Sequence, residues 1–148
     1  MPSPLISQDR VIPLAARKKL PALTELVDAL ATLPEVEDRE ELLQAIVQRE
    51  RDLSTAMGFG FAVPHAKIFS VREFVMAVGL SKEGIEFDAI DGLPVHLVVM
   101  IAGPVDRQRR YLQLLRQVTV ILREQDQRNK VIQSCDIVTA YDVFKTIE

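Results

Sequence analysis

The sequence predicts a single α/β or α+β domain in which a mixed β-sheet is flanked by helices. Three observations support this. Two segments with leucines at helical spacing come first, apolar runs rich in β-branched residues follow, and further helical segments end the chain. With 148 residues, of which 48% are hydrophobic, the chain has the size and composition of one globular domain. We therefore expect one domain over residues 1–148, and periodicity alone does not separate α/β from α+β.

The N-terminal third is predicted to contain an edge strand and two helices. Residues 11–14 form a short apolar run, in which Pro13 favours the edge of a sheet. A helix is expected over residues 20–33, because leucines recur there at spacings of three and four. Asp38 is predicted to cap a second helix, whose apolar stripe stops at the charged residues 48–52.

Three strands are predicted in the middle of the chain. Residues 59–63 alternate large apolar with small side chains, and residues 74–80 and 95–101 are nearly continuous apolar runs. Residues 81–84 and 91–92 have the composition of turns. Because too few residues separate the second and third strands for a crossover helix, we expect these two to pair antiparallel.

Two or three helical segments are predicted at the C-terminal end. Asp106 is expected to cap the first, residues 123–130 are expected to be a polar linker or helical break, and Asp136 is expected to cap the last helix. The buried face of the first helix is predicted to consist of Leu112, Leu115, Val118 or Thr119, and Leu122, and Leu114 and Ile121 are expected to widen it.

Composition excludes several classes of protein. The net charge of −3 argues against a general nucleic-acid binder. The single cysteine excludes an internal disulfide, and it has no cysteine neighbours for a zinc cluster. The longest apolar run, residues 97–102, is far shorter than the roughly 18 residues that a membrane helix needs. The N-terminus has no signal-peptide pattern, so we expect a cytoplasmic protein.

His65 is the main candidate for chemistry, because it follows glycines and Pro64 at the end of a predicted strand. Arg49, Ser54 and Thr55 precede it and could supply a cation and two hydroxyls to an oxyanion. Such a set can receive a phosphoryl group, since phosphoryl transfer depends mainly on positioning and charge stabilisation. The alternatives are an ordinary strand-end histidine, a surface arginine and helix-terminating hydroxyls. No GxxxxGK[ST] loop is present, so the donor should not be bound ATP.

Three segments resemble enzyme IIA domains of the fructose–mannitol class of the phosphoenolpyruvate-dependent sugar phosphotransferase system, a class that includes the nitrogen-regulatory IIA proteins. Residues 49–66, RERDLSTAMGFGFAVPHA, resemble the RE…ST…G…AxPH signature. Residues 87–95, FDAIDGLPV, resemble the FDAxDGxPV segment of the family, and residues 111–115 fall where the family has HLxxL. Roughly residues 5–148 are covered, and these segments together with the helix order are specific.

The resemblance implies a role for each site residue. His65 would be the phosphorylated histidine, and Arg49 would stabilise the phosphoryl group. Ser54 and Thr55 would match the serine–threonine pair near the site. The phosphoryl donor would be the phosphocarrier protein HPr or its nitrogen-branch paralogue, and in sugar uptake the acceptor would be a cysteine of a IIB domain. No metal and no organic cofactor is expected.

The chain departs from the family at Tyr111, where many members have a second active-site histidine. A tyrosine hydroxyl donates a hydrogen bond but does not become a cation at neutral pH. His96 could approach His65 in its place, or it could be structural. Arg107, Arg109 and Arg110 lie at the start of a predicted helix, where cations oppose the helix dipole. They indicate either an anionic neighbour or a solvated basic patch.

Three functions fit these observations. The first is a regulatory phosphoprotein, in which phosphorylation of His65 changes which regulated protein binds. The second is a sugar-uptake component that passes the phosphoryl group to a separate IIB domain. The third is a non-catalytic IIA-like binding module. We expect a free-standing domain, because 148 residues contain no fused IIB or membrane segment, and this favours the regulatory function.

Overall fold

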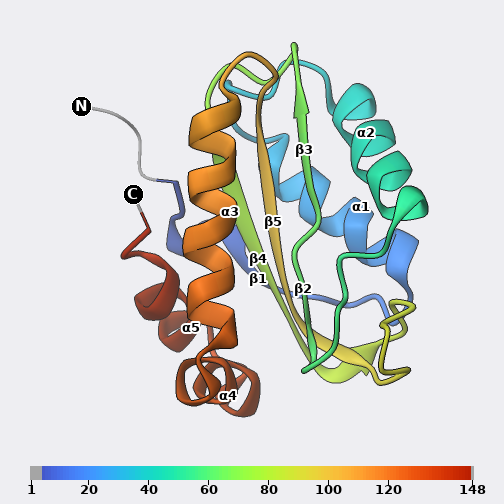
Figure 1. Cartoon of the computed structure of the whole chain (residues 1–148), viewed down its shortest axis with the longest axis vertical. Helices are drawn as coiled ribbons and strands as arrows, with labels where there is room; N and C mark the ends of the chain where they lie inside the picture. Colours follow the sequence, from blue (N-terminus) through green and yellow to red (C-terminus); the bar gives the residue numbers. More distant parts are fainter. Residues whose placement is uncertain (1–4, 148) are drawn as a thin grey trace.

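The computed structural model describes residues 5–147; residues 1–4 and 148 of the expected domain lie outside this range. Within it, a five-stranded mixed sheet lies between two layers of helices (Figure 1). The expected α/β architecture, a mixed sheet flanked by helices, is therefore confirmed. No helix in the described part of the chain is long and apolar enough to cross a bilayer.

The longest strands form the centre of the sheet. In chain order the strands are β1 (Val11–Pro13), β2 (Phe61–Ala62), β3 (His65–Ile68), β4 (Val75–Ile85) and β5 (Val95–Pro104). β4 and β5 pair antiparallel, as expected, and β1 joins β4 in parallel at one edge. β2 and β3 pair one after the other with β5, both in parallel. β2 and β3 therefore lie end to end along the same edge of β5, with a short gap between them.

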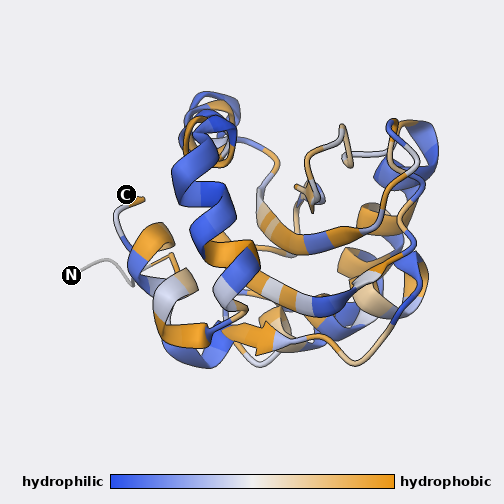
Figure 2. Cartoon of the chain, turned by 90° about the horizontal axis from the view of Figure 1, so that it is seen from below, coloured by the Kyte–Doolittle hydropathy of each residue, from blue (hydrophilic) through white to orange (hydrophobic). Residues whose placement is uncertain are grey.

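The helices cover the two faces of the sheet. A 3₁₀ turn (Gln8–Arg10) precedes β1, and α1 (Lys19–Leu30) and α2 (Arg39–Asp52) cover one face. The other face is covered by α3 (Gln108–Arg123), α4 (Gln125–Ser134) and α5 (Ile137–Phe144). Each face buries its own apolar core. In Figure 2 the strands are largely hydrophobic, whereas the helices carry hydrophilic residues.

Side-chain alternation along β5 supplies both cores. Leu97, Val99 and Ile101 belong to the core under α3, whereas Val98 and Met100 belong to the core under α1 and α2. All five side chains are buried. β5 is thus a rigid element at the centre of the sheet. It holds the backbone of the residues that pair with it in defined positions.

Two of the three predicted helix caps are confirmed, those of Asp38 and Asp136. The side chain of Asp38 accepts a hydrogen bond from the Glu41 backbone N–H at 3.1 Å, and that of Asp136 accepts from the Thr139 backbone N–H at 3.1 Å. The Asp106 cap is wrong, because α3 begins at Gln108 and Arg107 occupies the N-cap position.

Two strand predictions are wrong in extent. Phe59 lies outside β2 with φ +62° and a side chain that is 71% exposed, so pairing starts only at Phe61. Residues 81–84 are part of β4 rather than a turn. The register shifts between Leu80 and Ile85, and the Gly84 N–H donates to the Ser81 hydroxyl at 3.0 Å, with φ +96° at Gly84. The turn-favouring residues 81–84 therefore form an irregularity within one long strand, not a turn between two strands.

The C-terminal helices also differ from the prediction. Of the two alternatives expected over residues 123–130, the helical break is confirmed and the polar linker is wrong, because α3 ends at Arg123 and α4 begins at Gln125, with only Glu124 between them. The buried face of α3 is rotated, since Leu112 is 54% exposed. The residues that face the core are Tyr111, Leu114, Val118 and Leu122. The rotation turns the Tyr111 ring inward, toward β3.

Candidate functional site

His65 is the first residue of β3, and its backbone is in register with Ile101 of β5. His65 lies just past the end of β2, as expected, but it begins a further strand and does not open into a loop, because the chain resumes pairing after Pro64, whose carbonyl accepts from the Ile101 N–H at 3.0 Å. Ala66 packs into the core under α1 and α2. Strand alternation therefore turns His65 and Lys67 toward α3.

The imidazole of His65 is held by the backbone just before it. Nδ1 lies 2.6 Å from the carbonyl oxygen of Val63. A carbonyl only accepts, so Nδ1 carries the hydrogen and donates it. In the neutral ring the lone pair is then on Nε2. The tautomer places a nucleophilic nitrogen at the far side of the ring from Val63.

Tyr111 of α3 is the aromatic neighbour of this histidine. Its ring meets the His65 ring edge-on, with 5.7 Å between the centroids, and stacks on Phe74 at 6.4 Å. Burial raises the pKa of Tyr111 to about 12, against a smaller opposing effect of the Arg49 cation. Tyr111 is therefore a neutral phenol at physiological pH, and the structure brings this auxiliary residue to His65.

Arg49 approaches from the last turn of α2. Its Nη1 donates to the Leu53 carbonyl at 2.7 Å, which helps to close the end of the helix. The same cation lowers the pKa of both His65 and Tyr111. His65 thus lies within electrostatic reach of Arg49.

The pKa of His65 is lowered from its ordinary value of 6.5. Burial of the ring is the largest cause; the Val63 hydrogen bond opposes it, Arg49 adds to it and Glu50 opposes it. The imidazole is therefore neutral at pH 7. Because its folded-state pKa lies below the unfolded one, its contribution to stability is present above pH 6.5 and is lost as pH falls through the folded pKa.

We expect an NMR titration of His65 to give a midpoint below 6.5, and we expect Arg49→Gln to raise that midpoint, because it removes a nearby positive charge. Arg51→Gln is the matched control, since Arg51 is an exposed arginine in the same helix turn. A midpoint above 6.5 in the natural chain, or an equal shift in both variants, would contradict this electrostatic description.

Ser54 and Thr55 follow α2, and their hydroxyls are used within the fold. The Ser54 hydroxyl donates to the Phe87 carbonyl at 3.3 Å and accepts from the Ala56 N–H at 3.2 Å. The Thr55 hydroxyl donates to Glu50, whose other carboxylate oxygen accepts from the Thr55 N–H at 3.1 Å. The expectation that these hydroxyls face a phosphoryl group is not met in this structure, because both hydrogens already have acceptors.

Glu50 is the site-supporting residue that the sequence analysis missed. Its side chain is 2% exposed and forms an ion pair with Lys19 of α1 at 3.0 Å. Together with the two bonds to Thr55, this pair joins α1, α2 and the segment after α2. The charged run 48–52 hides this residue, because only burial distinguishes Glu50 from its solvated neighbours.

His96 lies at the opposite end of β5 from His65. It is five positions before Ile101, and at about 3.3 Å per residue the two histidines are roughly 16 Å apart along the strand. Its Nδ1 donates to the Ser81 carbonyl at 2.9 Å. The expectation that His96 approaches His65 is therefore wrong, and its structural alternative agrees with this bond.

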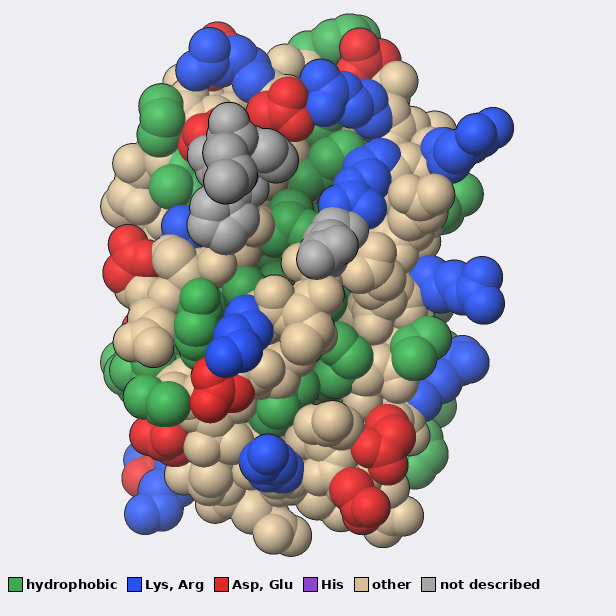
Figure 3. Space-filling model, turned by 90° about the vertical axis from the view of Figure 1, so that its left-hand side faces the viewer, with side chains coloured by type: hydrophobic (Ala, Val, Ile, Leu, Met, Phe, Trp, Pro, Cys, Tyr) green, Lys and Arg blue, Asp and Glu red, His purple; other side chains and the backbone are tan. Residues whose placement is uncertain are grey.

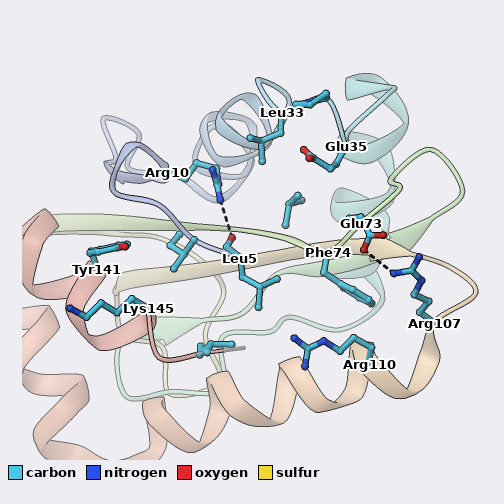
Figure 4. Close-up of a pocket in the computed structure, with 14 residues that line it drawn as sticks. Leu5, Arg10, Leu33, Glu35, Glu73, Phe74, Arg107, Arg110, Tyr141 and Lys145 are labelled. Carbon is cyan, nitrogen blue, oxygen red and sulfur yellow. Dashed lines mark hydrogen bonds and ion pairs between the residues drawn. The ribbon is translucent and has the colours of Figure 1, made fainter. Parts of the chain in front are cut away.

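Two of the three arginines at the start of α3, Arg107 and Arg110, line a groove whose lining does not include His65. This groove, of about 1070 Å³, is lined by Phe74, Arg107 and Arg110 among other residues. Arg107 is paired with Glu73 at 2.8 Å, close to Phe74 (Figure 4). Figure 3 shows this side of the molecule, with apolar side chains exposed among lysines and arginines. Phe74 and Tyr111, which stack, separate the groove from the imidazole.

The sequence matches known proteins over nearly its full length. The family model described as "Phosphoenolpyruvate-dependent sugar phosphotransferase system, EIIA 2" matches residues 5–147. A fructose-specific EIIA component of Haloferax volcanii is 34% identical over 126 residues, which cover 85% of this chain and 82% of that protein. A nitrogen regulatory protein of Bradyrhizobium diazoefficiens is 30% identical over 141 residues, covering 95% and 92%. The chain spans only 21% of a fructose-specific EIIABC component of Bacillus subtilis, to which it is 32% identical.

Solved structures have the same fold. The nitrogen regulatory protein IIA-Ntr of Neisseria meningitidis superposes with a TM-score of 0.86 at 20% identity, covering 94% of this chain and 95% of that one. The mannitol IIA structure of Escherichia coli gives a TM-score of 0.68 at 19% identity, covering 93% and 97%. The full-length family match and the relatives above 30% identity agree with the sequence resemblance. The chain belongs to the EIIA 2 family of the phosphoenolpyruvate-dependent sugar phosphotransferase system.

Proposed function

We propose that residues 1–148 act as one IIA domain that accepts a phosphoryl group on Nε2 of His65, and that its phosphorylation is a regulatory signal. The observation that carries the proposal is the bond between Nδ1 of His65 and the Val63 carbonyl, which leaves the Nε2 lone pair free. The lowered pKa supports it, because a neutral ring is the nucleophilic form.

The proposed step is an in-line transfer between two proteins. The Nε2 lone pair forms a bond to phosphorus while the bond from phosphorus to the donor atom of the carrier breaks, and its electron pair stays with the donor. The Nδ1–H bond to Val63 stabilises the positive charge that the ring acquires. Arg49, which acts electrostatically on His65, stabilises the transferring oxygens.

Ser54 and Thr55 have an indirect part in this proposal. Their hydroxyls hold the segment after α2 to Phe87 and Glu50, and this segment continues from the turn that carries Arg49. They therefore position the arginine rather than contact the phosphoryl group. Tyr111 contributes a neutral aromatic wall next to the imidazole.

The proposed partners follow from the family. The donor is HPr or its nitrogen-branch paralogue, and the protein that reads the phosphorylation state is a regulated protein. The relatives support the regulatory role in that a nitrogen regulatory protein matches 95% of this chain and is itself 92% covered. The fructose-specific EIIA component of Haloferax volcanii, matched at 34% identity, favours the second candidate, sugar uptake with a separate IIB domain.

One incubation separates these functions. The chain is mixed with phosphoenolpyruvate, enzyme I and either carrier, and a phosphoryl-accepting IIB domain is then added. The regulatory proposal expects acid-labile label that stays on this chain. Transfer of the label to the IIB domain would favour sugar uptake. An unlabelled chain with both carriers would contradict phosphotransfer and leave the non-catalytic binding module.

A further inference from the structure

Lys67 is the charged side chain on the same strand face as His65. The two residues are separated by one position of β3, so both project toward α3. The Lys67 ammonium lies over the ring of Tyr111, 5.3 Å from its centroid. The same ring also contacts His65, at 5.7 Å between centroids. A single phenol ring thus borders both the ammonium and the imidazole.

Nearby carboxylates are already paired with other cations. Glu50 binds Lys19 at 3.0 Å, and Glu73 binds Arg107 at 2.8 Å. Lys67 is instead placed on the face of a neutral phenol, which is a weaker partner than an anionic oxygen. Its ammonium is therefore available to a stronger partner at this site.

A phosphoryl group on Nε2 of His65 brings such a partner. Its oxygens are anionic acceptors, and a lysine with a flexible four-carbon stem can swing to them from the adjacent ring. Arg49 acts on His65 from α2. Lys67 would act from β3, so the two cations approach the group from different elements.

We propose that Lys67 is the second cation of the phosphoryl site and that its ammonium contacts the phosphoryl oxygens on His65. The proposal rests on His65 as the acceptor. Lys67 would supply the site with a positive charge that the neutral Tyr111 does not supply. Lys67 then leaves the Tyr111 ring upon phosphorylation, and the surface beside His65 changes with it.

The test uses chemical phosphorylation of the full chain with phosphoramidate, which needs no carrier protein. The protonation of the phosphoryl group is followed by ³¹P NMR, with the signal assigned by its absence in His65→Ala. An opposite charge at contact distance lowers such a midpoint by roughly one pH unit or more. We therefore expect Lys67→Met to raise the midpoint by about that amount and Lys67→Arg to leave it near that of the natural chain.

The control is Lys82→Met, which removes an exposed lysine on β4 and should leave the midpoint unchanged. An unchanged midpoint in Lys67→Met would overturn the proposal, since a merely structural lysine would not move it. A His65 that phosphoramidate leaves unmodified in the folded chain, but modifies in the unfolded chain, would overturn it too, because Nε2 must be open. A chain that phosphoramidate phosphorylates on His65, but that neither protein carrier phosphorylates, would count against the proposed function and not against the proposed role of Lys67.

Discussion

The His65→Gln chain should incorporate no acid-labile phosphoryl group from a phosphorylated carrier, whereas the natural chain should be labelled. Glutamine has about the reach of histidine, but its amide nitrogen has no lone pair available for a bond to phosphorus. We expect the loss of label to be complete, and we expect stability to fall by only about 1 kcal/mol, because the change removes one hydrogen bond to Val63.

The chain has its own matched control for this variant. His96 is the other of its two histidines, and it lies near the far end of β5, bonded to the Ser81 carbonyl. His96→Gln should therefore keep its label. Labelling of His65→Gln, or loss of label in a folded His96→Gln chain, would show that the phosphoryl acceptor is not His65.

Glu50→Ala should destabilise the fold by about 3–5 kcal/mol, measured by urea unfolding. The change removes a buried carboxylate, so that Lys19, whose side chain is 15% exposed, loses its partner. The Thr55 N–H and hydroxyl also lose their acceptors. Leaving a buried charge and two buried donors without partners is among the costliest effects of a single substitution.

Two further variants separate the lost pair from lost packing. Glu41→Ala truncates an exposed glutamate in the same helix and should change stability by no more than about 0.5 kcal/mol. The double variant Glu50→Leu with Lys19→Met should be more stable than the sum of the two single changes predicts, because no unpaired charge remains. A loss below about 1 kcal/mol in Glu50→Ala would contradict the structural role of the pair.

The predictions that held depend on local sequence. Asp38 and Asp136 cap helices because a carboxylate bonds the backbone only three residues on. Pro13 lies at the sheet edge because it has no N–H to donate. That His65, Arg49 and Tyr111 form a phosphoryl site stays a prediction; the fold shows a ring contact between His65 and Tyr111 and an electrostatic effect of Arg49 on His65.

The predictions that failed depend on contacts far apart in sequence. Residues 81–84 read as a turn, but β5 continues to pair beyond the irregularity, so β4 extends to Ile85. Leucine spacing predicts a face of α3 without Tyr111, whereas the apolar body of the Tyr111 side chain belongs to the buried stripe. Lys67 was missed for a related reason, since its alternation with His65 appears only once β3 is known to include both residues.

The direct test of the account is the position of phosphorus on the imidazole. The ¹⁵N-labelled chain, phosphorylated by its carrier, is studied by NMR for the nitrogen of residue 65 that is coupled to phosphorus. The bond from Nδ1 to the Val63 carbonyl predicts phosphorus on Nε2 of His65. Phosphorus on Nδ1, or on His96, would contradict it.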